Sequence, residues 1–275
     1  MSAIAFAAIS LLGIVFLQTY DIEEDDISSV NVEDIKPSKH DLVPKRGGDV
    51  TGCQLITTFN FHFLFWAYIF CAGLQLTFQT NITAYLKSYN MEKQYSTLFT
   101  TLNPIFGVVS KFIAGFMSDM LVHKVPRMAV LFGFNILQTI VLVICIFFSN
   151  ELSVLVIALV GISMPNGALW CLTPTMLSEF YGMKYFGRNW GMIMFGNAFG
   201  GLIMQRVFGW IYDSSIGFTG QTVCHGLHCY TWSFIMMAVL SACSCLFNAA
   251  ILESELNLYK LTAKERRMGQ PAVDK

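Results

Sequence analysis

An all-α integral membrane protein with about seven transmembrane helices is the fold class that this sequence predicts. Of its 275 residues, 55% are hydrophobic and only 13% are charged, whereas about a quarter of the residues in a soluble domain are charged. The charges are grouped, and many of the stretches between them reach the roughly 20 apolar residues that span a bilayer. The net charge of −1, from 17 basic and 18 acidic residues, does not suggest a nucleic-acid partner.

Seven apolar runs account for most of the chain. We expect each to be a helix because backbone groups in lipid must bond within their own segment, and the short alternating segments of a membrane barrel are not seen. The runs are Ser2–Tyr20, Thr57–Leu86, Gln94–Met120, Met128–Ser149, Leu152–Ser178, Asn189–Tyr212 and Cys229–Leu252. The chain then divides into a transmembrane helix (1–20), a cytosolic disordered linker (21–56), a six-helix transmembrane bundle (57–252) and a cytosolic tail (253–275).

Basic residues predict the orientation of this bundle. Loops that would share one side carry 13 of the 17 basic residues, and the other side carries only Lys87 and Lys93. The 13 are Lys36, Lys39, Lys45, Arg46, Lys124, Arg127, Lys184, Arg188, Lys260, Lys264, Arg266, Arg267 and Lys275. Because cytosolic loops are rich in lysine and arginine, this side is expected to be cytosolic. The N-terminus is then outside and the C-terminus inside.

The two N-terminal segments allow alternative interpretations. Ser2–Tyr20 has no basic residue before it, which favours a spanning helix over a cleaved signal peptide. The linker after it contains the acidic run Asp21, Glu23, Glu24, Asp25 and Asp26 and has few large apolar residues. Such a segment does not bury enough surface to fold alone. A solvated tether is favoured over a regulatory element.

Polar side chains inside the apolar runs are the candidate solute-binding residues. They are Gln75, Gln79, Asn103, Lys111, Asn197 and Arg206. Polar groups in membrane helices usually face the bundle interior or a water-filled cavity. The alternatives are hydrogen bonds between helices for the amides, and snorkelling toward the headgroups for the two cations. A buried cation costs about 3 kcal/mol or more when unpaired, and Lys111 lies about 12 Å along the helix from Asp119, so a solute contact is favoured for Lys111.

Two charged turns are expected on the cytosolic side. The stretch KFIAGFMSDMLVHKVPR (Lys111–Arg127) runs out of the membrane into the first turn, and Glu179 and Arg188 flank the second. We expect Asp119, Arg127, Glu179 and Arg188 to form a charge cluster. The cluster is interpreted either as a latch for one conformation of a transporter or as surface pairing of small energetic value.

The remaining motifs are few. Cys224 and Cys229 flank two histidines outside the membrane, where a disulfide closing a short loop is favoured over a zinc site. The other cysteines are interpreted as small apolar residues. None of the common nucleotide-binding, hydrolase or metalloprotease motifs is present, so neither an enzyme nor a cofactor is expected.

Several of these stretches carry a family resemblance. Lys111–Arg127 resembles the helix-turn-helix loop motif of the major facilitator superfamily. The segment Gly167–Gly201, the pair Tyr212-Asp213 and the sequence CHGLHCY (Cys224–Tyr230) look like the last helices of its nodulin-like members. Those are similar to monocarboxylate and oxalate/formate transporters, in which a basic residue, usually arginine, stands at the position of Lys111 and contributes to substrate anion handling. Lysine keeps the charge but loses the bidentate fork of arginine.

The resemblance implies alternating-access transport of a small organic anion by two bundles that rock against each other. It covers about residues 57–255 and equates this chain with the sixth helix and the C-terminal bundle, so an incomplete chain is expected. The expected partners are the lipid bilayer and a small solute; proton coupling, self-association and pairing with an N-terminal half are open hypotheses. A seven-helix receptor and a non-transporting partner of a longer transporter are the alternatives. Plasma and organelle membranes are equally compatible with the sequence.

Overall fold

The computed structural model describes residues 50–88, 92–122, 124–148, 152–219 and 228–269. Within them a short helix, α2 (Cys53–Ile56), precedes six long ones. These are α3 (Phe59–Ser88), α4 (Glu92–Leu121), α5 (Arg127–Phe148), α6 (Leu152–Tyr181), α7 (Phe186–Thr219) and α8 (His228–Gly269). The predicted all-α bundle is therefore confirmed. The first predicted helix at 1–20, nearly all of the linker and Cys224 lie outside the described residues.

Five of these helices, α3, α4, α5, α6 and α8, are long and apolar enough to cross a membrane. The glycine-rich α7 carries Asn197, Gln205 and Arg206 along its length, which lowers its hydropathy. The last helix does not end near Leu252 as its apolar run does, because α8 continues to Gly269 through a charged sequence. Part of the predicted tail is thus helical.

Prolines lie inside two of the long helices. Pro104 lies within α4, and Pro165 and Pro174 lie within α6, which is nevertheless one helix from Leu152 to Tyr181. A proline removes one backbone hydrogen bond and needs compensation from neighbours. Next to Pro165, the hydroxyl of Ser110 in α4 donates to the carbonyl of Met164. The proline-containing part of α6 is therefore held by its neighbour.

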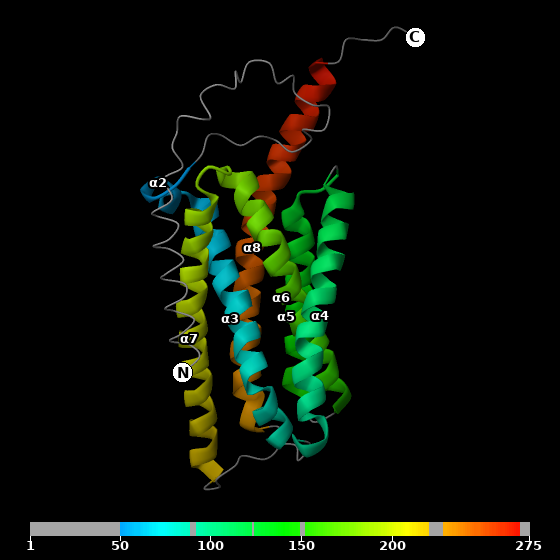
Figure 1. Cartoon of the computed structure of the whole chain (residues 1–275), viewed down its shortest axis with the longest axis vertical. Helices are drawn as coiled ribbons and strands as arrows, with labels where there is room; N and C mark the ends of the chain where they lie inside the picture. Colours follow the sequence, from blue (N-terminus) through cyan, green and yellow to red (C-terminus); the bar gives the residue numbers. More distant parts are fainter. Residues whose placement is uncertain (1–49, 89–91, 123, 149–151, 220–227, 270–275) are drawn as a thin grey trace, which may run out of the picture. The chain divides into compact units, whose positions relative to one another are not determined.

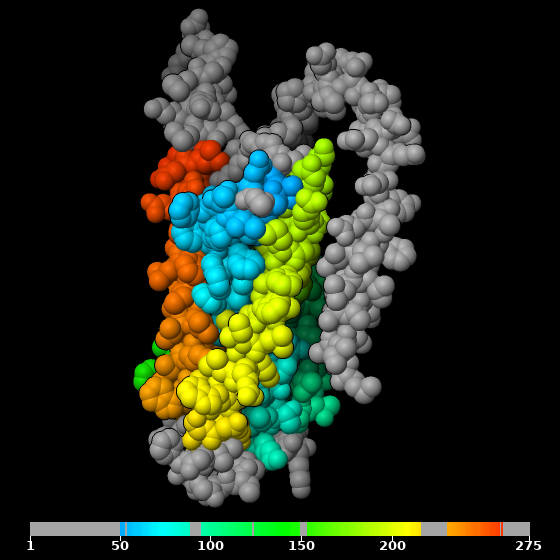
Figure 2. Space-filling view, turned by 90° about the vertical axis from the view of Figure 1, so that its left-hand side faces the viewer, coloured from blue at the N-terminus to red at the C-terminus, as the bar shows by residue number. Residues whose placement is uncertain are grey.

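Helix α3 lies at the centre of the bundle. It packs against α8 and α7, and also against α4 and α6. The α4–α6 and α5–α8 pairs make the other extensive contacts, and α6 also packs on α5. Figure 1 shows α7 on one side of α3, with α4, α5 and α6 grouped on the other. Figure 2 shows α7 running along one face of the bundle, beside α8.

Two apolar clusters fill the interior, one toward each end of the helices. One contains Phe78, Leu142, Leu159, Phe208 and Phe234, and the other contains Leu64, Leu131, Leu172, Ile193 and Ile251. Buried polar residues of α3, α4, α5, α6 and α8 lie near the boundary between these two clusters. They are Gln75, Asn103, Ser110, Asn135, Gln138, Ser163, Ser241 and Ser244. We call this set the polar layer; it crosses the bundle at mid-length.

Candidate functional site

A buried hydrogen-bonded triad joins α3, α4 and α6 in the polar layer. The side-chain nitrogen Nε2 of Gln75 donates to Oδ1 of Asn103 at 3.2 Å, and the Ser163 hydroxyl donates to the same oxygen. The three residues are 5%, 2% and 0% exposed, respectively. Gln75 and Asn103, both predicted to face a solute, thus bond to each other between helices. Ser163 was not predicted, because a single serine in an apolar run carries no signal of such a role.

Close contact between α4 and α6 continues next to this triad. A Cβ atom built on Gly167 would lie 2.2 Å from the carbonyl oxygen of Gly107. That distance is far below any normal contact, so α6 approaches α4 this closely only because residue 167 is glycine. The bond from Ser110 to Met164 lies in the same contact. These contacts fix the position of α4 along α6.

Lys111 lies on the outer face of α4. Its side chain is exposed, and its exposed neighbours Val108 and Phe112 are apolar. No hydrogen bond or ion pair joins Lys111 to another of the described residues. Ser110, one position earlier, faces α6 instead. The helix therefore holds its buried polar groups on one side and presents a lone cation on another.

The other predicted solute-binding residues do not join the triad. Gln79 and Arg206 are exposed, and Asn197 is half-buried in α7. Near them a small polar group connects α3 to α7. Gln205 donates to the Thr80 hydroxyl at 2.8 Å and accepts from Asn81 at 3.4 Å. Gln205 was not predicted, although an amide beside Arg206 in an apolar run is a signal that sequence reasoning can use.

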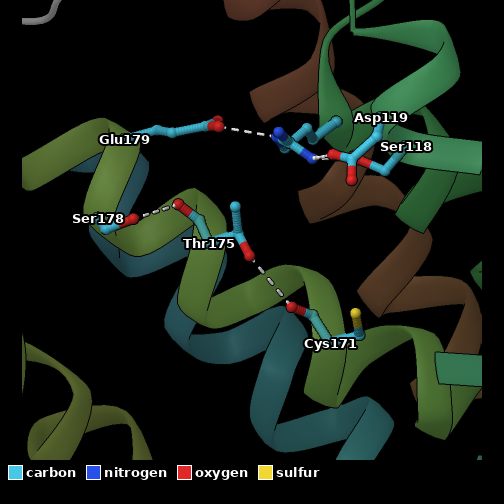
Figure 3. Close-up of polar contacts among 7 residues, drawn as sticks. Ser118, Asp119, Cys171, Thr175, Ser178 and Glu179 are labelled. Carbon is cyan, nitrogen blue, oxygen red and sulfur yellow. Dashed lines mark hydrogen bonds and ion pairs between the residues drawn. The ribbon is translucent and has the colours of Figure 1, made fainter. Parts of the chain in front are cut away.

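Three of the four predicted gating charges meet where α4 and α6 end and α5 begins. Figure 3 shows Asp119 and Glu179 pointing toward each other, and Arg127 bonds to both, at 2.6 Å and 2.7 Å. The hydroxyl of Ser118 accepts a further bond from the guanidinium at 2.8 Å. The side chains of Arg127 and Glu179 are 17% and 22% exposed, whereas that of Asp119 is 71% exposed. The Arg127–Glu179 pair is thus the better shielded one.

Arg188 lies outside this charge cluster. Its guanidinium carbon is 5.8 Å from the centre of the Tyr185 ring, in a cation–π contact. The side chain is exposed at the start of α7. Charge alone grouped Arg188 with the other three, but the turn from α6 to α7 directs it elsewhere. The cluster that the described residues form is Asp119, Arg127 and Glu179, with Ser118 as an added acceptor.

The sequence of residues 64–271 matches the Major Facilitator Superfamily profile. This match covers most of the chain, and the chain belongs to that superfamily of membrane proteins. A multi-pass integral membrane location follows from the family and the apolar helices.

The chain is similar to several fungal proteins. A probable transporter MCH1 of Yarrowia lipolytica is 27% identical over 181 residues, covering 62% of this chain and 37% of the relative. Another probable transporter MCH1, of Wickerhamomyces anomalus, is 26% identical over 181 residues, covering 64% of this chain and 36% of the relative. A probable transporter mch1 of Emericella nidulans is 40% identical over 88 residues, or 30% of this chain and 14% of the relative. The matched region thus spans little more than a third of the first two relatives.

Proposed function

We propose that this chain takes part in the transmembrane transport of a small organic anion by alternating access, with Lys111 as a contact for the anion. The observation that carries the proposal is the unpaired, exposed lysine within a membrane-spanning helix. The names of the fungal relatives support transport as the general activity. The monocarboxylate-transporter-like branch is the part of the family that this solute class suggests.

The cost of placing a charge in the membrane favours an aqueous environment for Lys111. A lysine at the middle of a bilayer costs about 3 kcal/mol or more when it has neither partner nor water. Lys111 has no partner among the described residues, and its exposed neighbours on α4 are apolar. A water-filled cavity beside α4 removes this cost, and an anion that enters the cavity is attracted to the ammonium group. The ammonium group selects an anion, and the resemblance to monocarboxylate transporters adds the small carboxylate as the class of solute.

The buried triad has a supporting role in this proposal. Gln75 and Asn103 bond between helices, so their contribution is to hold α4 at a fixed height against α3 and α6. This fixes the depth of Lys111 in the membrane. Gln79, Asn197 and Arg206 remain candidate solute contacts because each has some exposure.

The charge cluster is proposed to stabilise one conformation at the cytosolic side. Arg127 ties the end of α4 to the end of α6 through Asp119 and Glu179. A conformational change that separates the two helix ends must break these bonds, and charge-assisted hydrogen bonds are worth about 1.5–3 kcal/mol each when well shielded. The cluster therefore biases the transporter toward the state in which it is formed.

Uptake measurements on the longest natural product that contains this chain test the proposal. Cells expressing it are supplied with labelled small carboxylates, and the Lys111→Ala variant is compared with the unchanged protein. The matched control is Lys87→Ala, which removes an exposed lysine at the outer end of α3. Losing one charge-assisted contact predicts a reduction in uptake of about tenfold or more for Lys111→Ala, and no reduction for Lys87→Ala.

Uptake by the variants is compared at equal amounts of protein at the cell surface. Unchanged carboxylate uptake by Lys111→Ala would reject a solute role for this lysine. Uptake of neutral solutes only, unaffected by the substitution, would reject the anion class while leaving transport itself in place.

A further inference from the structure

Two glutamines in the polar layer each leave one amide group without a protein partner. Gln75 donates through Nε2 to Asn103, and its Oε1 is buried with no partner among the described residues. Gln138 accepts through Oε1 from the Cys71 thiol at 3.1 Å, and its Nε2 is buried without a partner. The residues are 5% and 0% exposed, respectively. One unused acceptor and one unused donor are thus left.

Gln75 and Gln138 lie within about one helical turn of each other in depth. Cys71 and Gln75 are four residues apart on α3, which places them on one face about 6 Å apart along the axis. Helices α5 and α6 are in close contact at Val141 and Gly161, since a Cβ atom built on Gly161 would lie 2.5 Å from the Val141 side chain. Since α5 and α6 run in opposite directions, Gln138 is level with the Ser163 part of α6. Ser163 belongs to the triad of Gln75.

Leaving both groups unsatisfied is costly. A buried polar group without a hydrogen bond costs about 1–3 kcal/mol, and here the surrounding clusters are apolar. No direct bond joins the two amides. A water molecule that accepts from one amide and donates to the other joins atoms about 4.5 Å apart, because its two bonds of about 2.8 Å meet at a near-tetrahedral angle. Buried waters typically form hydrogen bonds to polar groups that have no protein partner.

We infer that a water molecule is bound in the polar layer, accepting from Gln138 Nε2 and donating to Gln75 Oε1. It connects the triad of α3, α4 and α6 to α5. Elsewhere on α5, Asn135 donates to the Ser244 hydroxyl at 2.9 Å and Thr139 bonds to Ser241 at 2.8 Å, so α5 also bonds to α8. The water thus adds a hydrogen-bonded link between the triad and α5. This site is independent of the solute contact proposed for Lys111.

A double-mutant cycle tests whether the two amides share one ligand. The variants are Gln75→Met, Gln138→Met and the double variant, chosen because methionine is flexible and similar in length. Each single variant leaves the water and the remaining amide poorly bonded, so each lowers the unfolding temperature in detergent by about 4 °C. The double variant removes the whole site, so its unfolding temperature is expected to fall by far less than the sum of the two single decreases. The control pair, Gln138→Met with Thr80→Ala, is expected to be additive because the Thr80 hydroxyl bonds to Gln205 outside the polar layer.

Additive effects of Gln75→Met and Gln138→Met, or a rise in unfolding temperature for either single variant, would overturn the shared water. The drop of a single variant does not by itself discriminate, because Gln75→Met also removes the bond to Asn103 and Gln138→Met the bond from Cys71; the coupling between the two substitutions does.

A second measurement uses the unsubstituted protein. X-ray-generated hydroxyl radicals oxidise side chains beside bound water, and two buried thiols provide the comparison. Both thiols lie in apolar clusters, Cys71 2% and Cys145 0% exposed, but only Cys71 bonds to an amide of the polar layer, that of Gln138. Faster oxidation of Cys71 than of Cys145 is expected, and equal slow oxidation contradicts a water beside Gln138. Protection of Cys71 by a saturating small carboxylate would also overturn it, in favour of a solute group at the site.

Discussion

Helices α3 and α4 are alike in length and mean hydropathy and opposite in placement. Both have 30 residues, and their most apolar windows have mean hydropathies of 1.4 and 1.3. Yet 67% of that window is buried in α3 and only 17% in α4. In α4 the buried residues, such as Asn103 and Ser110, are confined to one side, and Phe112, Phe116 and Lys111 lie outside it. Hydropathy predicts that a helix spans a membrane, but not whether it is central or peripheral.

The sharpest way to test this contrast is to truncate one phenylalanine on each helix. Phe78 of α3 is 2% exposed and Phe112 of α4 is 75% exposed. Lipid is as apolar as the interior, so the cost of truncation comes mainly from the cavity. Phe78→Ala is expected to lower the free energy of unfolding by about 2–3 kcal/mol, and Phe112→Ala to leave it nearly unchanged. Equilibrium unfolding in mixed micelles measures both, and equal losses would contradict the placement of α4.

A smaller effect is expected where α4 meets α6. Gly167→Ala places a methyl group against the Gly107 carbonyl, and such overpacking costs about 1–3 kcal/mol. The control is Gly133→Ala in α5, where a Cβ atom meets nothing within 4 Å. Alanine favours a helix over glycine by about 1 kcal/mol, so the control is expected to stabilise. The two substitutions thus differ in sign, and stabilisation by Gly167→Ala would show that the helices are not in close contact there.

The smallest effects are expected at the ends of α4 and α6, where Arg127 pairs with Asp119 and Glu179. Glu179→Gln removes the shielded charge partner of Arg127 and is expected to cost about 1–2 kcal/mol. Asp119→Asn removes an exposed partner, 71% exposed, and is expected to cost less than about 1 kcal/mol. Because salt screens exposed pairs more strongly, 1 M sodium chloride is expected to reduce the Asp119 effect first. A larger cost for Asp119→Asn in the same unfolding assay would reverse the ranking of the two pairs.

The sequence predicted the helices well because long uncharged runs in a bilayer have few alternatives to a helix. It also predicted that Asp119, Arg127 and Glu179 lie on one side, since each is next to a turn between apolar runs. Which side chains meet was harder to predict. In α3 the apolar residues surround the helix, so no periodic pattern indicates where Gln75 points. Ser163 and Gln138 were missed as partners because one polar residue in an apolar run does not identify the helix it faces.

The proposed function requires that Lys111 is exposed to an aqueous path, and a chemical rescue experiment tests this requirement. In a Lys111→Cys variant, carboxylate uptake is expected to be lost and then restored by a reagent that adds an ethylammonium group to the thiol. A reagent of similar size that adds a sulfonate is not expected to restore it, and the unsubstituted protein treated in the same way controls for the native cysteines. Full uptake by Lys111→Cys before treatment, or equal rescue by both reagents, would contradict the claim.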